Sequence, residues 1–289
     1  MKLSRGVLYM AASAFGFSAM SVLVKVASER LPTGEIVLAR AVVTLGLSYA
    51  MIARAGLPPP APWGTRRAGL VFRGVLGFGG LAAYYAALAR LPLADATTIQ
   101  NIVPLITALL AWWVLRERVG GSTFVALACG FAGVLLIVHP SGAGLDPVGV
   151  LNALGAALFS SVAYVTVRQL ARTEHPLVIV FYFPLVATPL AIPWAAAEWV
   201  TPSAVEVLLL VAIGLTTQVG QVSLTMGLAV ERVGRATSVG YLQIVFAMGW
   251  QLAVFGDAPE LPTIAGAALI IAGTLVVAGV APRVEDRAA

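Results

Sequence analysis

Eight stretches of this chain run for about 20 residues without a charged side chain, and this pattern leaves few folds open. A helix needs about 20 apolar residues to cross the hydrocarbon core of a bilayer. Two further stretches, 34–53 and 69–89, each contain one arginine, Arg40 and Arg73. The sequence therefore predicts ten transmembrane helices. The eight uncharged stretches are 6–24, 96–115, 119–138, 147–167, 176–197, 207–230, 236–256 and 261–282.

Composition supports a membrane protein. The chain is 60% hydrophobic and 11% charged, with a mean hydropathy of +0.93, whereas globular domains carry about 25% charged residues. The long apolar runs lack the alternation of a membrane β-barrel, so the fold class is an all-α membrane protein. The basic residues are scattered, which disfavours nucleic acid as a partner. Cys129 is the only cysteine, so neither a disulfide nor a cysteine metal site is expected.

The second half of the chain repeats the first. With an offset of 140 residues, similar or identical residues coincide at several places, and with an offset of 143 Lys25 coincides with Arg168. We therefore predict one transmembrane domain over 1–289, built from a repeat of five helices at 1–144 and another at 145–289. Secondary transporters commonly have internal repeats with the substrate site between them. The pairs at offset 140 are Gly74/Gly214, Gly80/Gly220, Ala96-Thr97/Ala236-Thr237, Glu117/Asp257 and Gly133/Gly273.

The distribution of basic residues predicts the orientation. If the N-terminus is cytoplasmic, 13 lysines and arginines fall on the cytoplasmic side and three on the other, with Arg40 and Arg73 inside segments. Such a bias places both termini in the cytoplasm. Because each repeat has five helices, the second repeat enters the membrane inverted. The expected location is the bacterial cytoplasmic (inner) membrane, with multiple passes.

Polar side chains within these helices mark candidate substrate-binding positions, because a polar group in the bilayer needs a partner or a wet cavity. Thr97, Gln100, Asn101 and Pro104 share one helix face, and Pro104 frees a backbone carbonyl. The alternative is that such residues bond a neighbouring helix, or that the tyrosines form an interfacial belt or fill the core. The candidate residues are Tyr84, Tyr85, Thr97, Gln100, Asn101, Ser160, Tyr164, Gln218, Gln221, Tyr241 and Gln243.

The acidic residues indicate the transport mechanism. All of them fall in loops, tails or helix ends, while proton-coupled transporters usually keep a titratable group at mid-depth. This predicts facilitated diffusion or exchange of a neutral or zwitterionic solute, with proton coupling and sodium coupling as alternatives. There is no phosphate-binding loop for ATP, and no cofactor or metal is expected. Neither Arg40 nor Arg73 is placed clearly at mid-depth, which disfavours phosphorylated substrates.

Particular segments resemble the EamA-type ten-helix exporters of the drug/metabolite transporter superfamily. They are FGFSAMSVLVK at 15–25, LARAVV around Arg40, LADATTIQNIVPLITALLAWWVLRER at 93–118 and GFAGVLLIV at 130–138. The second half departs from the pattern, with Ile244 in place of a proline and Asp257 where glutamate is usual. The resemblance implies a basket of inverted repeats, alternating access, and a central cavity lined by the third, fourth, eighth and ninth helices.

Among the substrates that this resemblance implies, amino acids fit the candidate residues best. Tyr84, Asn101, Gln218 and Tyr241 are expected to hold the zwitterionic end of the solute or stack on its side chain. The alternatives are a drug or other metabolite efflux transporter, and, in a different class, a membrane enzyme or structural partner subunit. No GxSxG or HExxH motif supports catalysis. We expect a monomer or homodimer, with Gly266 packing inside the monomer.

Overall fold

The computed structural model describes residues 4–57, 62–88, 90–91, 93–138, 144–256 and 260–279, and within these ranges it contains helices and connections but no strand. The predicted all-helical membrane fold is confirmed. Nine spans in the described residues are long and apolar enough to cross a bilayer, and α10 with α11 occupies the tenth predicted span. The helices are α1 (Arg5–Ala27), α2 (Thr33–Arg54), α3 (Arg67–Leu88), α4 (Leu93–Gln100), α5 (Val103–Val114), α6 (Gly121–Val138), α7 (Pro147–Leu170), α8 (Pro176–Ala197), α9 (Ala204–Val230), α10 (Val233–Val239), α11 (Leu242–Phe255) and α12 (Leu261–Gly279).

Two of the predicted spans are broken helices. The span predicted at 96–115 divides into α4 and α5, and the one at 236–256 divides into α10 and α11. Pro104 explains the first break, because it has no N–H to donate to the carbonyl of Gln100. The second break has no proline. There the backbone tightens into three-residue turns, in which the N–H of Gln243 donates to the Gly240 oxygen at 3.0 Å.

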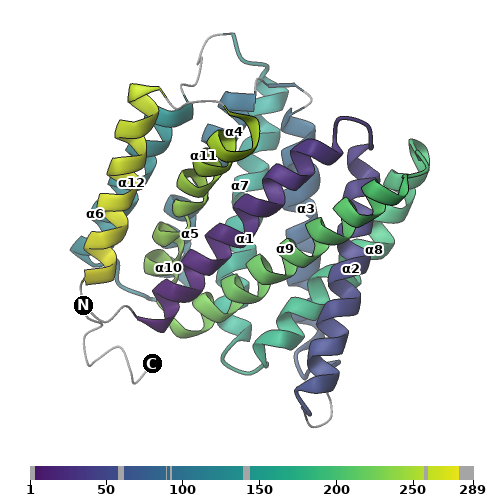
Figure 1. Cartoon of the computed structure of the whole chain (residues 1–289). Helices are drawn as coiled ribbons and strands as arrows, with labels where there is room; N and C mark the ends of the chain where they lie inside the picture. Colours follow the sequence, from purple (N-terminus) through teal and green to yellow (C-terminus); the bar gives the residue numbers. More distant parts are fainter. Residues whose placement is uncertain are drawn as a thin grey trace.

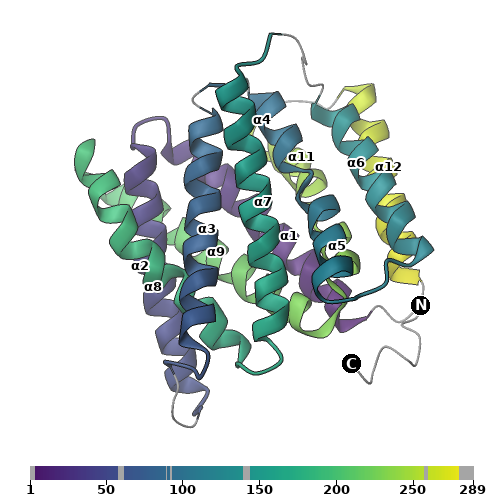
Figure 2. The ribbon, with the colours of Figure 1, turned by 180° about the vertical axis from the view of Figure 1, so that it is seen from behind.

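The helices pair across the two halves of the chain. α1 packs against α9 on one face, and α3 against α7 on the opposite face, as the two views in Figure 1 and Figure 2 show. The pair of α2 and α8 forms one edge of the bundle, and the pair of α6 and α12 forms the other. The broken helices lie between the central pairs and the edge formed by α6 and α12, with α10 and α11 beside α1, and α4 and α5 beside α7. Both breaks therefore lie inside the bundle.

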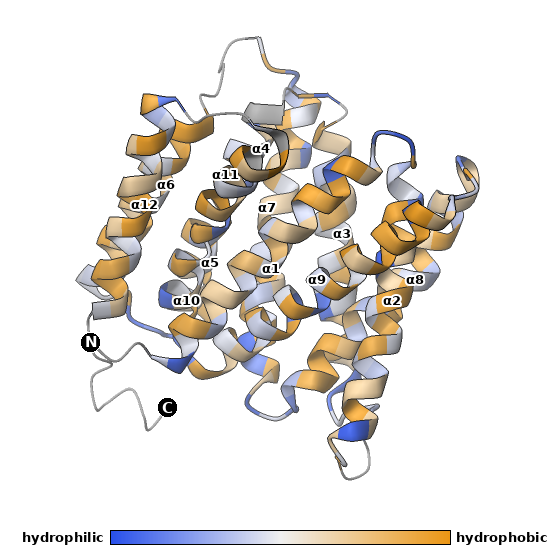
Figure 3. Ribbon diagram, viewed as in Figure 1, coloured by the Kyte–Doolittle hydropathy of each residue, from blue (hydrophilic) through white to orange (hydrophobic). Residues whose placement is uncertain are grey.

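Hydropathy follows this arrangement. Hydrophobic residues cover the helices and hydrophilic residues gather in the connections at the two ends (Figure 3). The beginning of α1 and the end of α12 lie at the same end of the bundle (Figure 1). We call this end the α1-start end.

Glycines allow the closest helix contacts. A Cβ placed on Gly133 of α6 would lie 2.6 Å from the Gly266 oxygen of α12, and one on Gly266 would lie 2.6 Å from the Gly133 oxygen. The two backbones therefore touch, which only glycine permits. Gly266 thus packs within the chain, as expected from the sequence.

Candidate functional site

Five predicted site residues form a polar column between α3, α4 and α7. The Tyr84 hydroxyl lies 3.3 Å from Oγ1 of Thr97, and Nε2 of Gln100 donates to Oγ of Ser160 at 3.5 Å. Tyr164 lies one turn beyond Ser160 on α7 and continues the column toward the α1-start end. These side chains are half-buried. The column combines hydroxyl, phenol and amide groups inside an apolar bundle, as expected for a polar solute pathway.

Asn101 and Tyr241 join the two broken helices. The Tyr241 hydroxyl donates to the main-chain oxygen of Asn101 at 3.1 Å. Asn101 in turn donates from Nδ2 to the Thr97 oxygen at 2.8 Å. Since Asn101 lies between α4 and α5, its carbonyl is outside the regular helical ladder and needs such a donor. Tyr241 lies between α10 and α11, is 1% exposed, and therefore fixes one break against the other.

The predicted residues on α9 lie apart from this column. Nε2 of Gln218 donates to Oγ of Ser48 on α2 at 3.0 Å and contacts Sδ of Met51 at 3.4 Å. Gln221 is buried, and its Nε2 has no hydrogen-bond partner among the described residues. The structure thus places Gln218 in a helix–helix contact, which is the alternative that the sequence left open.

Two further candidates also lie outside the column. The Tyr85 ring packs edge-on against Trp194 of α8, with centroids 5.6 Å apart, and is tilted against Tyr84 at 6.3 Å. Tyr84 and Tyr85 therefore point to different neighbours, α4 and α8. Gln243 is half-buried near the start of α11.

Arg73 lies next to the column and interacts electrostatically with Tyr164, although the sequence interpretation left it out. Its side chain is buried, with its guanidinium carbon 4.8 Å from the centroid of the Phe183 ring of α8. A Cβ placed on Gly77 would lie 3.6 Å from its Nη1. The head group therefore reaches about 15 Å along α3 from Arg67, near the middle of that helix, a depth that the sequence did not clearly give it. Its spacing from Gly77, Gly80 and Tyr84 was the available signal.

The other arginine within a span has a different environment. Nη1 of Arg40 contacts Sδ of Met20 at 3.7 Å. Glu35, which is close in sequence, instead accepts a hydrogen bond from the Val200 N–H at 3.2 Å. Glu35 therefore connects α2 with the segment before α9 and does not hold Arg40.

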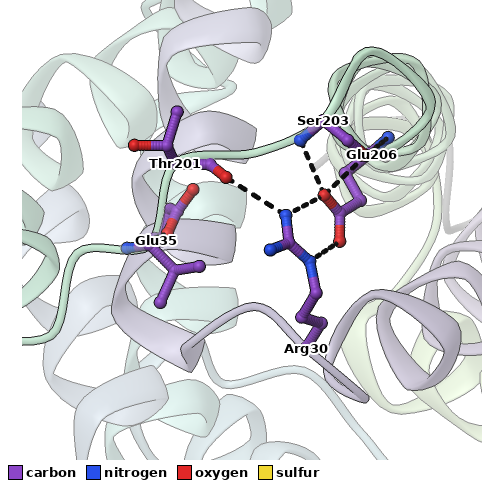
Figure 4. A network of polar contacts seen from close by, with 6 residues as sticks. Arg30, Glu35, Thr201, Ser203 and Glu206 are labelled. Carbon is purple, nitrogen blue, oxygen red and sulfur yellow. Dashed lines mark hydrogen bonds and ion pairs between the residues drawn. The ribbon is translucent and has the colours of Figure 1, made fainter.

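A polar network closes the end of the bundle away from the start of α1 (Figure 4). Arg30 forms a two-pronged ion pair with Glu206 and donates to the Thr201 oxygen at 3.1 Å. The hydrogen bond to the Glu206 side chain raises the pKa of Arg30. This network ties the α1–α2 connection to the beginning of α9.

A second network closes the α1-start end. Nε of Arg168 lies 3.0 Å from Oε1 of Glu117, and its Nη1 donates to the Ala229 oxygen at 2.6 Å. Oε2 of Glu117 accepts from the Val233 N–H at 2.8 Å. One carboxylate thereby holds the ends of α5 and α7 and the beginning of α10 together. The Glu117 and Arg168 side chains are 12% and 16% exposed, so this pair is better shielded from water than a surface pair.

A surface pocket of about 560 Å³ lies between α3 and α7 at the α1-start end. Its lining includes Arg66, Arg67 and Phe72 of α3 and its approach, and Thr166 and Gln169 of α7. Tyr164, at this end of the column, lies on α7 within about one turn of Thr166, which lines the pocket. The pocket is therefore placed at one end of the column.

Acidic residues contribute little inside the bundle. Each aspartate and glutamate in the described ranges lies in a connection, at a helix cap or in the first turn of a helix. In the described part of the chain, no three histidine, cysteine, aspartate or glutamate side chains are grouped so that they could hold a metal ion. Asp257 and His139 lie outside the described residues. The positive charge of Arg73 thus has no carboxylate beside it in the described part of the bundle.

The sequence profile of the EamA-like transporter family matches the chain twice, at residues 4–139 and 147–279. Among named proteins, pseudopaline exporter CntI of Pseudomonas aeruginosa is 36% identical over 273 residues, which cover 93% of this chain and 94% of the exporter. Solute carrier family 35 member G1 of Mus musculus is 28% identical, over 93% of this chain and 77% of its own.

Other similarities are more distant. The S-adenosylmethionine uptake transporter of Rickettsia prowazekii is 26% identical and covers 72% of this chain and 70% of its own. A crystal structure of a protein superposes with a TM-score of 0.84 at 20% identity, over 95% of this chain and 96% of that one. At this identity the likeness concerns the fold.

Proposed function

The chain belongs to the EamA-like transporter family, and from this premise we propose that it exports amino acids or similar small zwitterionic metabolites across the bacterial inner membrane. It is a multi-pass membrane transporter of a small-molecule substrate and not an enzyme. The observation that carries the proposal is the polar column of Tyr84, Thr97, Gln100, Ser160 and Tyr164. The hydrogen-bonding groups of these five residues are uncharged, and the buried Arg73 next to them adds a positive charge; this combination suits a solute that carries a carboxylate and is neutral overall.

We further propose that the two halves are inverted repeats with both termini in the cytoplasm, and that they rock about the Asn101–Tyr241 contact to give alternating access. The support is positional. Both breaks occur inside the bundle, and the two contacting residues are 140 positions apart, the offset that relates the halves of the sequence. Reporter fusions at the N-terminus and at the C-terminus test this orientation. It would be contradicted if the two reporters lay on opposite sides of the membrane.

Transport itself is tested in proteoliposomes. Proteoliposomes that contain the purified protein and are loaded with an unlabelled neutral amino acid are expected to accumulate the labelled amino acid by counterflow without ATP. Flux no greater than in empty liposomes, over all neutral amino acids, would contradict the proposal. Flux that requires an imposed pH gradient would overturn the uncoupled mechanism, which rests on the peripheral position of the described acids.

A matched pair of variants connects transport with the column. Gln100→Ala removes the amide that bonds Ser160 and should lower the flux at least tenfold. Glu29→Ala truncates an exposed side chain in the connection between α1 and α2, outside the column and the pocket, and should leave the flux unchanged. Equal flux in both variants would remove Gln100 from the pathway.

A second candidate function is export of a larger metabolite, and the observation that favours it is the 36% identity with a pseudopaline exporter. Counterflow with pseudopaline in the same proteoliposomes separates the two candidates. Exchange of pseudopaline without exchange of any neutral amino acid would support the second and reject the first.

A further inference from the structure

We infer that Arg73 is the carboxylate anchor of the substrate site and that Gln100 accepts the substrate's ammonium group, so that the column selects α-amino carboxylates. This inference rests on the proposed transport function and names the chemistry that its site requires. It comes from three features of the column and of Arg73 next to it: a cation with unsatisfied N–H groups, an amide oxygen without a donor, and the levels of the two groups along α3.

The cation is the guanidinium of Arg73. The residue is 3% exposed, and its buried Nε and Nη1 have no hydrogen-bond partner in the described parts of the chain. The Phe183 ring supports one face of the group, but a ring face satisfies no N–H at its edge. A buried charge without a partner is strongly unfavourable. A ligand carboxylate, which matches the planar fork of arginine with two parallel hydrogen bonds, is the group that best fills this vacancy.

The acceptor is the side chain of Gln100. Its Nε2 is used by Ser160, which fixes the amide so that Oε1 is the free atom. That oxygen is buried and has no partner within the described ranges. A substrate ammonium, which carries donors and no acceptor, supplies what this oxygen lacks.

The two groups lie at neighbouring levels along the axis of α3. The head of Arg73 lies at the level of Gly77. A Cβ placed on Gly80 would lie 3.1 Å from Oγ of Ser160, the atom that Gln100 bonds. Three residues of helix rise separate these levels, or about 4.5 Å. This axial offset is compatible with a carboxylate and an ammonium on one carbon atom.

The surroundings favour the approach of an anion from the α1-start end. Arg66 and Arg67 line the surface pocket between α3 and α7, close to the end of the column where Arg73 and Tyr164 lie. Basic groups at a mouth raise the local concentration of anionic groups. Tyr164 interacts electrostatically with Arg73, and it adds a phenol beside the anchor.

The test compares L-leucine with three analogues in purified protein: leucinamide, isoamylamine and 4-methylpentanoate. The first two lack the carboxylate, and the last lacks the ammonium group. Binding is measured by competition against labelled leucine in equilibrium dialysis, and by thermal shift with the full set of neutral amino acids and their amides. We expect the wild type to prefer leucine over leucinamide at least tenfold.

The variants then assign the preference. Arg73→Gln should reduce the preference for the acid over the amide to less than twofold, Arg73→Lys should keep part of it, and Arg54→Gln, at the exposed end of α2 and outside the pocket, should keep all of it. Gln100→Leu should instead reduce the preference for leucine over 4-methylpentanoate. Since Nε and Nη1 of Arg73 have no hydrogen-bond partner among the described residues, Arg73→Gln should melt at the wild-type temperature or above, whereas a structural role would lower the melting temperature.

The outcomes separate this inference from the transport proposal. A wild type that binds acids and amides equally, or binds none of them, overturns the role of Arg73, and so does an Arg73→Gln variant that keeps the preference. Counterflow of amides as fast as acids would overturn the anchor while supporting transport. Arg73-dependent binding of acids without any flux would support the anchor and count against transport.

Discussion

The hydroxyl of Tyr241 lies 3.1 Å from the main-chain oxygen of Asn101, and both residues interrupt a helix that would otherwise cross the bundle. The contact satisfies a carbonyl that the break between α4 and α5 removes from the helical ladder. It also joins the two broken helices at their interruptions. A side chain from one half of the chain thus stabilises a backbone irregularity in the other.

Tyr241→Phe should destabilise the protein by about 1–3 kcal/mol, because it leaves the part-buried Asn101 carbonyl without a donor. Thermal or denaturant unfolding in detergent measures this change. Tyr9→Phe is the matched control, since Tyr9 is 38% exposed, and it should have no effect. Equal stability of the two variants would mean that another group satisfies this carbonyl.

Gly130→Ala should also disturb the contact between Tyr241 and Asn101, because it acts on the Tyr241 ring. A Cβ at this position would lie 2.2 Å from Cδ2 of Tyr241, so the ring must move. Overpacking of this kind costs about 1–3 kcal/mol. Gly46→Ala on α2 is the control, because no atom lies within 4 Å of the added carbon, and it should be neutral or slightly stabilising. The melting temperature of Gly130→Ala should be below that of the wild type, and that of Gly46→Ala should equal or exceed it. Equal melting temperatures of the two variants would contradict the packing.

The Glu117–Arg168 pair should show a larger coupling energy than an exposed pair. A double-mutant cycle with Glu117→Gln and Arg168→Gln is expected to give a coupling within about 0.5–3 kcal/mol, the range for contacting residues. The same cycle on Arg90 and Asp146, whose side chains are 53% and 35% exposed, should give about 0.2–1 kcal/mol. A smaller coupling for the shielded pair would contradict its role in closing the α1-start end.

Stability should fall in acid through Glu174, in the connection between α7 and α8. Burial raises its pKa, but hydrogen bonds from the Thr65 side chain and from the N–H groups of Arg66 and Thr65 outweigh it, so its pKa lies below the ordinary value of 4.5. A lowered pKa means that the stabilisation is complete above pH 4.5 and is lost as the pH falls through the folded value.

Unfolding of wild type and Glu174→Gln across this pH range measures that contribution. The variant should be less stable at neutral pH, and the difference should shrink as the carboxyl is protonated. Glu29→Gln changes an exposed glutamate and serves as the control. A difference between wild type and Glu174→Gln that is independent of pH would contradict the linkage.

The fold could be predicted from the sequence because the bilayer imposes one simple rule. Long uncharged runs must be helices, and each predicted run coincides with a helix or a broken pair of helices. Pro104 also indicated the first break, since proline removes a backbone donor. The break at Tyr241 could not be foreseen in this way. It depends on three-residue turns and on a hydrogen bond to a residue in the other half, and no single sequence window contains both.

The candidate site was predictable only as a set of polar residues. Periodicity places Thr97 and Gln100 on one helix face, but it does not reveal which neighbouring helix that face meets. Gln218 has equally favourable spacing, and the structure pairs it with Ser48 on α2. Arg73 was missed because a charge near a helix start is normally assigned to the membrane surface. Its long side chain carries the guanidinium several residues deeper than its Cα.

The close approach of Gly133 and Gly266 has a consequence for biogenesis. α6 packs mainly against α12, which is the last described helix to leave the ribosome. During synthesis, α6 is therefore inserted into the membrane long before α12, its packing partner, has been made. A chain that stopped after Glu260 would expose the groove around Gly133 to lipid. We expect such a truncated product to be recognised by membrane quality-control proteases, even though its polar column would already be assembled.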